Sequence, residues 1–137
     1  MKKIRVGLLG FGTVGSGTAK ILLENKDLLD ARLGAELELK WIGDLDVDSD
    51  RGVTVDKRVR TTDAKKVIND PEVDIIVELV GGYEPAKSFM LAAIENGKHV
   101  VTANKALLAA YGEEIFAAAS KQGVEIGFEA SVGGGIP

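Results

Sequence analysis

Three glycines near the start of the chain have the spacing of a phosphate-binding turn. Gly10, Gly12 and Gly15 form a GxGxxG between an apolar, strand-like segment and a helical stripe. The first glycine of such a motif permits a tight turn, the second lets a pyrophosphate approach the backbone, and the third lets helix and strand pack closely. The phosphates lie on free N–H groups at the helix N-terminus. We therefore expect the turn to bind a dinucleotide through Gly10, Phe11, Gly12, Thr13, Val14 and Gly15.

Asp44 is a second candidate binding residue, because it directly follows the next predicted strand, 36–42. A carboxylate at that place accepts hydrogen bonds from the adenosine ribose hydroxyls. Asp44 lies further from Gly15 than the roughly 20 residues typical of the motif, and the intervening helix and loop account for the difference. The carboxylate would repel a 2′-phosphate, which favours NAD over NADP. The alternative is a solvated acidic loop, since three more aspartates follow at alternate positions.

Two short segments after later strands complete the predicted cofactor site. The glycines of Glu78–Gly82 would let the backbone approach a flat cofactor ring, or they form a plain turn. The segment Thr102–Lys105 ends in a lysine, which is either a solvated cation or a positioned proton donor for hydride transfer to a carbonyl. Lys105 is therefore a candidate catalytic residue, and the candidate cofactor contacts here are Val80, Gly81, Thr102, Ala103 and Lys105.

Two further candidates carry weaker signals. The segment 129–136 combines one carboxylate with a glycine-rich loop, a set of oxygen donors that suits a hard cation, although many loops have this composition. His99 stands alone at the start of a predicted strand, and a structural or solvated histidine is the simpler interpretation.

Composition excludes several classes of function. The chain has 137 residues, 45% hydrophobic and 28% charged, as expected for one globular domain with its own core. The absence of cysteine rules out disulfides, thiolate catalysis and cysteine-type zinc sites. A net charge of −4 without a basic cluster argues against nucleic acid as a partner. No apolar run approaches the ~20 residues of a membrane span, so we expect a cytoplasmic protein without membrane contact.

Strand and helix patterns alternate along the chain and would position these residues. Strands are predicted from Ile4 and over 36–42, 59–61, 73–80, 100–101 and 124–128, and helices over 14–29, 64–69, 86–94 and 108–119. Pro85 suits the first turn of a helix, and Gly97 and Gly123 suit helix ends. The last helix should be interrupted near Gly112. The aromatic residues Trp41, Phe89 and Phe128 are assigned to the core.

This βαβα order predicts an α/β fold, a Rossmann-type doubly wound parallel sheet with helices on both faces. Ligands of such sheets bind beyond the carboxyl ends of the strands, where every candidate residue above is expected to lie. The chain stops directly after a glycine-rich loop. We expect residues 1–137 to be one dinucleotide-binding domain, with a further domain after Pro137.

The chain resembles the N-terminal cofactor domain of homoserine dehydrogenase over nearly its whole length. The resemblance rests on four segments, 10–15, 78–86, 97–105 and 129–137, of which the last two are more specific than the glycine motif. It implies interconversion of L-homoserine and L-aspartate 4-semialdehyde with NAD or NADP, in the biosynthesis of threonine, methionine and isoleucine. The expected partner is therefore this small-molecule substrate.

The resemblance also supports a catalytic role for Lys105 and implies a sodium-like, monovalent cation site. Its ligands would be the Glu129 side chain and the carbonyls of Val132, Gly134 and Ile136. Many family members carry an arginine suited to a 2′-phosphate near the end of the second strand, where this chain has Gly43-Asp44. The family's substrate-binding and dimerisation region, with a second catalytic lysine, would follow Pro137, so a homodimer or higher oligomer is expected through that region. The alternative from another class is a non-catalytic, NAD-sensing module.

Overall fold

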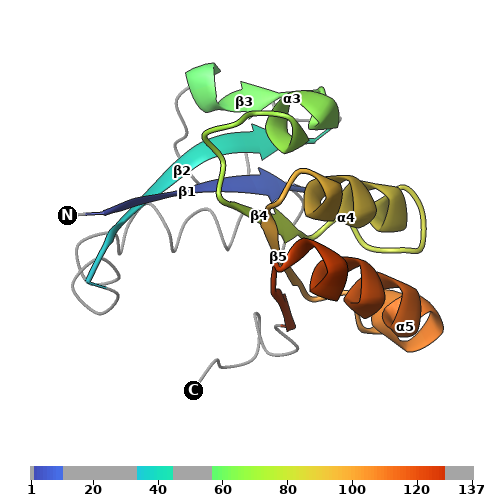
Figure 1. The fold of residues 1–137 in the computed structure, drawn as a ribbon. Coiled ribbons are helices and arrows are strands. Elements are labelled where there is room, and N and C mark those ends of the chain that lie inside the picture. The colour runs from blue at the N-terminus through green and yellow to red at the C-terminus, as the bar shows by residue number, and fades with distance from the viewer. Residues whose placement is uncertain (1, 11–33, 45–56, 129–137) are drawn as a thin grey trace.

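The computed structural model describes residues 2–10, 34–44 and 57–128, which form one sheet with helices packed on it. Elements carry the labels of Figure 1. In chain order they are β1 (Lys3–Leu9), β2 (Glu36–Gly43), the short 3-10 helix η1 (Lys57–Val59), β3 (Arg60–Thr61), α3 (Ala64–Ile68), β4 (Ile75–Glu78), α4 (Ala86–Glu95), β5 (His99–Thr102), α5 (Lys105–Gln122) and β6 (Ile126–Phe128).

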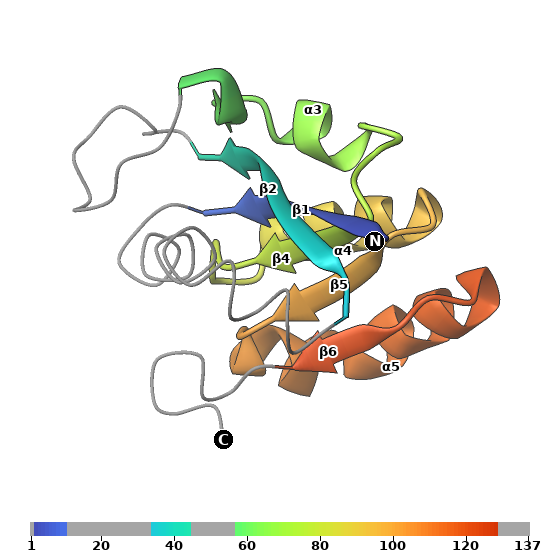
Figure 2. The same ribbon diagram turned by 90° about the vertical axis from the view of Figure 1, so that its left-hand side faces the viewer.

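The six strands are all parallel, in the order β3-β2-β1-β4-β5-β6. Figure 2 shows the labelled strands pointing the same way, so that their carboxyl ends lie along one edge of the sheet. The order runs outward from β1 to β3 and then returns to the centre at β4. This reversal confirms the predicted Rossmann-type winding and places its switch point between β1 and β4.

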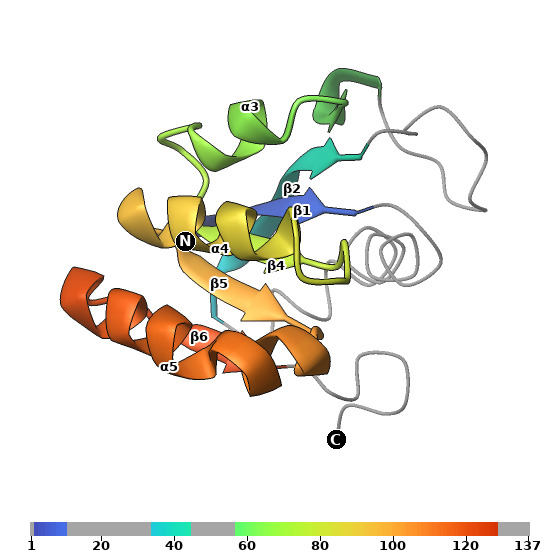
Figure 3. The ribbon, with the colours of Figure 1, turned by 90° about the vertical axis from the view of Figure 1, so that its right-hand side faces the viewer.

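Helices α3, α4 and α5 cover one face of the sheet (Figure 3). Strand alternation divides the core, because Leu9 faces these helices while its neighbour Leu8 belongs to a cluster with Ile42 on the other face. The main cluster joins the strands to all three helices through fully buried side chains such as Val67, Met90 and Ile115. The predicted helix over 14–29 lies outside the described residues.

Helix boundaries agree with the sequence signals in most places. Gly123 adopts a φ of +70° and ends α5, and Tyr111 breaks the helical dihedrals with φ −130° beside Gly112, where an interruption was predicted. α5 begins at Lys105, three residues before the predicted start, because Asn104 caps it by accepting a hydrogen bond from the Leu107 N–H. Pro85 occupies the N-cap position of α4.

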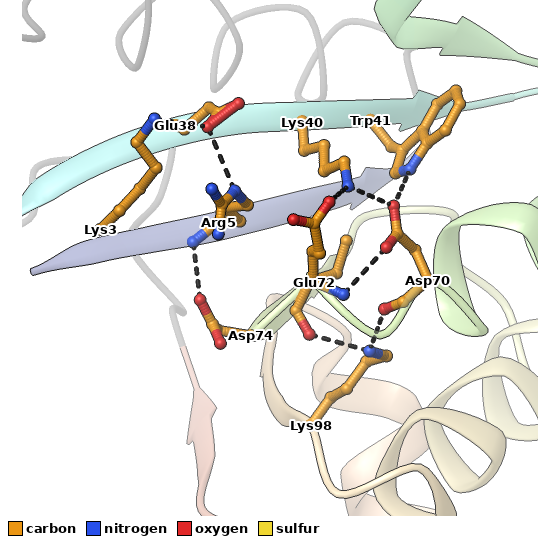
Figure 4. Close-up of polar contacts among 10 residues, drawn as sticks. Lys3, Arg5, Glu38, Lys40, Trp41, Asp70, Glu72, Asp74 and Lys98 are labelled. Atoms are coloured by element: carbon orange, nitrogen blue, oxygen red, sulfur yellow. Dashed lines mark hydrogen bonds and ion pairs between the residues drawn. The ribbon is translucent and has the colours of Figure 1, made fainter.

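Polar contacts hold the loop between α3 and β4 against the sheet (Figure 4). The Asp70 carboxylate accepts from the Lys40 ammonium at 2.8 Å and from the Trp41 indole N–H at 2.7 Å. The buried Lys98 ammonium donates to the carbonyls of Asp70 and Val73 at 2.6 and 2.8 Å. The Trp41 ring is partly buried and packs on the core, as Phe89 does, and its indole N–H serves Asp70, a polar contact that the assignment to the core did not include.

Phe89 packs against the core as predicted, and the side chain of Phe128 lies outside what the structure describes. Within the described ranges, no helix combines the length and apolar character that crossing a membrane requires.

Candidate functional site at the carboxyl edge of the sheet

Gly10 follows β1 at the switch point and lies against the ends of two other strands. Its N–H donates to the carbonyl of Gly43 at 2.8 Å, and its φ is +101°. A Cβ on Gly10 would lie 2.8 Å from the carbonyl carbon and oxygen of Leu79. Both the dihedral and this close approach require glycine, in agreement with a tight turn here. Residues 11–15 of the predicted turn lie outside the described residues.

A cavity of about 410 Å³ opens beside Gly10. Asp44 lies at its wall, and its N–H donates to the carbonyl of Thr61 at 3.1 Å, which ties the end of β2 to β3. Apolar side chains form much of the lining. The lining residues are Leu9, Gly10, Gly43, Asp44, Thr62, Ala64, Leu79, Val80, Pro85 and Phe89. The structure therefore brings Gly10, Asp44 and Val80, three of the predicted cofactor contacts, to one cavity.

The turn after β4 depends on its two glycines. Gly81 and Gly82 have φ of +82° and +72°, a conformation that L side chains rarely adopt, although a Cβ on either would meet nothing within 4 Å. The glycines are therefore needed for the backbone conformation and leave the outer side of the turn open. The first residue of the turn is still paired with β1, because the Leu79 N–H donates to the Leu9 carbonyl at 2.8 Å.

A buried polar cluster connects this turn to the start of α5. The Glu78 carboxylate, fully buried, accepts from the N–H groups of Val80 and Gly81 at 2.9 and 3.1 Å. Its other oxygen accepts from the Thr102 hydroxyl at 2.6 Å. That hydroxyl accepts from the Asn104 N–H at 3.0 Å, and the Asn104 amide donates to the Gly82 carbonyl at 2.6 Å. We call Glu78, Thr102 and Asn104 the edge clamp.

A second cavity, of about 240 Å³, lies beside the edge clamp. It is lined by Glu78, Leu79, Gly81, Ala103, Asn104 and Lys105. Leu79 lines both cavities, so the turn after β4 separates them. Lys105, exposed and first in α5, shares this cavity with Gly81 and Ala103, two of its predicted neighbours. The buried hydroxyl of Thr102 is committed to Glu78, which leaves its backbone for any ligand contact.

Sequence reasoning included the segment of Glu78 but gave the acid and Asn104 no role. A signal was present: Glu78 ends a strand that is otherwise apolar, and Thr102 is its partner in the register of β4 and β5. Recognising it requires the strand pairing. His99 is exposed and its Nδ1 accepts from the Glu125 N–H at 3.1 Å, a structural contact consistent with the interpretation above.

The predicted cation ligands Glu129, Val132, Gly134 and Ile136 all lie outside the described residues. Among the residues that the structure does describe, no cluster of three or more histidine, aspartate or glutamate side chains could hold a metal ion.

Comparison with known proteins decides the family. A family model described as "Homoserine dehydrogenase, NAD binding domain" matches residues 10–129. The chain belongs to this family. The homoserine dehydrogenase of Bacillus subtilis (strain 168) is 48% identical over 137 residues, which are 100% of this chain and 32% of that protein. The chain thus spans about a third of the length of this relative.

Solved structures agree with the assignment to the homoserine dehydrogenase NAD-binding domain. A homoserine dehydrogenase from Thiobacillus denitrificans superposes with a TM-score of 0.86 at 48% identity, over 96% of this chain and 30% of that one. A hyperthermophilic archaeal homoserine dehydrogenase in complex with NADPH superposes with a TM-score of 0.74 at 24% identity, over 94% of this chain and 44% of that one, and shares the fold.

Proposed function

We propose that this chain is the cofactor domain of a complete homoserine dehydrogenase that interconverts L-homoserine and L-aspartate 4-semialdehyde with NAD or NADP, on the route to threonine, methionine and isoleucine. The observation that carries the proposal is the pair of cavities on either side of the turn after β4, with Asp44 at one and Lys105 at the other. In this proposal residues 1–137 bind the cofactor, and the region after Pro137 supplies the substrate and dimerisation domain.

The two cavities fit the two halves of a dinucleotide. The larger one has apolar walls for a base and a carboxylate, Asp44, that can accept hydrogen bonds from ribose hydroxyls. Residues 10–15 would carry the pyrophosphate at the switch point. The smaller cavity offers the backbone of Gly81 and Ala103 to the nicotinamide half, with Lys105 at its wall. Such a division puts the reacting end of the cofactor beside Lys105, the only side-chain cation among the described residues that line the smaller cavity.

When bound, a nicotinamide cofactor supplies or accepts the hydride of the reaction. Lys105 would donate a hydrogen bond from its ammonium to the aldehyde oxygen of the substrate and stabilise the negative charge that develops there. It would then transfer a proton to that oxygen, and in the reverse direction accept the proton of the hydroxyl. As the first residue of α5, Lys105 lies at the positive end of the helix dipole, which adds to this stabilisation.

The closing segment completes the proposal. A sodium-like cation would be held by the Glu129 side chain and the carbonyls of Val132, Gly134 and Ile136. This ligand set rests on the family resemblance.

Substitution of Lys105 tests the proposal in the complete enzyme. Lys105→Ala should lower kcat by about 10²-fold or more if the ammonium is the general acid–base, while the Kd for NADPH changes little. Lys105→Arg should not restore kcat, because a guanidinium does not release a proton near neutral pH. Lys121→Ala, an exposed lysine in the last turn of the same helix, is the matched control.

Near-normal kcat in both Lys105 variants would remove the proposed role of this residue. Binding of NADH or NADPH without any turnover of homoserine by the complete wild-type protein would favour the non-catalytic NAD-sensing module instead.

A further inference from the structure

The edge clamp buries a carboxylate that the proposed reaction does not use. Glu78 and Thr102 are both 0% exposed and end two neighbouring strands, and the other buried side chains in the described part of the sheet are apolar. Taking a carboxylate out of water costs several kcal/mol unless hydrogen bonds replace its solvation. Glu78 has such bonds from two backbone N–H groups and one hydroxyl. An apolar residue at position 78 would avoid this desolvation cost altogether. The presence of a carboxylate therefore points to a role in fixing the geometry of the segments that it holds by hydrogen bonds.

The clamp joins the two segments that form the smaller cavity. On one side, Glu78 holds the N–H groups of Val80 and Gly81, and Asn104 holds the carbonyl of Gly82. On the other side, Thr102 and Asn104 are the residues that lead into α5, and Asn104 also caps that helix. Since Lys105 directly follows the cap, its backbone is fixed relative to the turn after β4 through three side chains.

We propose that Glu78 is a positioning residue, which acts through Thr102 and Asn104 to fix the spacing between the turn after β4 and Lys105. This inference rests on the proposed function and deepens it, because that spacing is the width of the cavity assigned to the nicotinamide half. A displacement of about 1 Å in a reacting group can cost on the order of 10²-fold in rate, so the clamp sets catalytic efficiency through the spacing of the cavity walls.

The Thr102 hydroxyl is the donor in its hydrogen bond with Glu78. This hydroxyl accepts from the Asn104 N–H, so its own hydrogen points to Glu78. Thr102→Val keeps the side-chain shape but removes both contacts, and Thr102→Ser keeps them. Glu78→Gln preserves volume and presents an amide N–H to Thr102 in place of an acceptor. Asn104→Asp retains the helix cap and removes the donor to the Gly82 carbonyl.

Lys98→Met is the matched control for lost stability. It removes two hydrogen bonds of a buried ammonium, to the carbonyls of Asp70 and Val73. These bonds lie at the amino edge of the sheet, away from both cavities at the carboxyl edge. Any effect of general destabilisation on turnover should therefore appear in this variant as well.

Three measurements test the inference, all at a temperature where each variant is folded. Amide hydrogen exchange without cofactor should be faster at Asn104 in Thr102→Val, which shows that the clamp is broken. The Kd for NADPH, from fluorescence of the reduced nicotinamide, should stay within about threefold. In the complete enzyme, kcat should fall by about 10- to 100-fold in Thr102→Val, Glu78→Gln and Asn104→Asp, recover most of this loss in Thr102→Ser, and stay unchanged in Lys98→Met.

Unchanged kcat in both Thr102→Val and Glu78→Gln, with exchange at Asn104 increased, would overturn the inference and leave the clamp a structural feature. An equal loss of kcat in Lys98→Met would overturn it too. If Thr102→Val does not fold, the isosteric Glu78→Gln and the cap-preserving Asn104→Asp decide. Failure of the wild-type enzyme to bind either NADH or NADPH, or to reduce the aldehyde with either, would instead refute the proposed function, so the two failures are distinguishable.

Discussion

Substitution of Gly10 by alanine should cost far more stability than the same change at Gly97. Both glycines have positive φ, +101° at Gly10 and +74° at Gly97, so each alanine pays a left-handed backbone penalty of about 1–2 kcal/mol. Each also gains about 0.4–1 kcal/mol from a less flexible unfolded chain. At Gly97 the new methyl group meets nothing within 4 Å. The net cost there should be about 1 kcal/mol.

At Gly10 the methyl group would meet backbone that is held in place. It would lie 2.8 Å from the carbonyl carbon and oxygen of Leu79, whose N–H is bonded to the Leu9 carbonyl. Overpacking of this kind adds about 1–3 kcal/mol, so Gly10→Ala should lose about 2–4 kcal/mol in total.

Urea unfolding followed by fluorescence measures both variants, because Trp41 is the single tryptophan of the chain. The midpoint should shift with little change in the slope of the unfolding free energy against urea concentration. Gly10→Ala should also weaken NADPH binding, since Gly10 and Leu79 both line the larger cavity, whereas Gly97 lies outside both cavities of the candidate site. Equal destabilisation by the two substitutions would refute the argument from contact with Leu79.

Two further predictions concern charge. Burial favours a higher pKa for Asp70, but hydrogen bonds from Lys40, Trp41 and the Glu72 N–H outweigh it and lower this pKa from 3.8 to about 2. The resulting stability, about 2 kcal/mol, is present above pH 4 and is lost as the pH falls toward 2. Asp70→Asn should therefore remove the pH dependence of the unfolding free energy in this window, which urea titrations at several pH values measure. Asp44→Ser should raise affinity for NADPH relative to NADH by about tenfold in fluorescence titrations, and a wild-type preference for NADPH would contradict the role given to Asp44.

The order of strands and helices could be read from the sequence because it depends on local signals. Gly123 marks a helix end by its left-handed φ, and the apolar run at 75–77 marks a buried strand whatever its neighbours are. The bounds were less predictable. The pattern placed Val73 in a strand, yet its N–H donates to the Asp70 carbonyl in the preceding turn, and the strand begins at Ile75.

Contacts across the sheet could not be predicted in the same way. The partner of Glu78 is Thr102, which lies 24 residues away and becomes its neighbour only through the register of β4 and β5. Trp41 was placed in the core because its ring is apolar, and the carboxylate that receives its N–H comes from a loop 29 residues later. Polar pairing of this kind depends on tertiary arrangement, which periodicity within a segment does not encode.

Because β1 lies between β2 and β4, the larger cavity forms only when parts of the chain that are distant in sequence pair in the sheet. β1 pairs with β2 on one side and with β4 on the other, and the Arg5 N–H reaches the Asp74 carboxylate over a separation of 69 residues. Contacts so distant in sequence form only against the closure entropy of the intervening loop. Gly10 and Leu79, at neighbouring strand ends, meet only when β1 and β4 pair. The cavity is therefore a property of the fully assembled sheet, and a ligand that touches both walls stabilises the native state alone and no partly folded form.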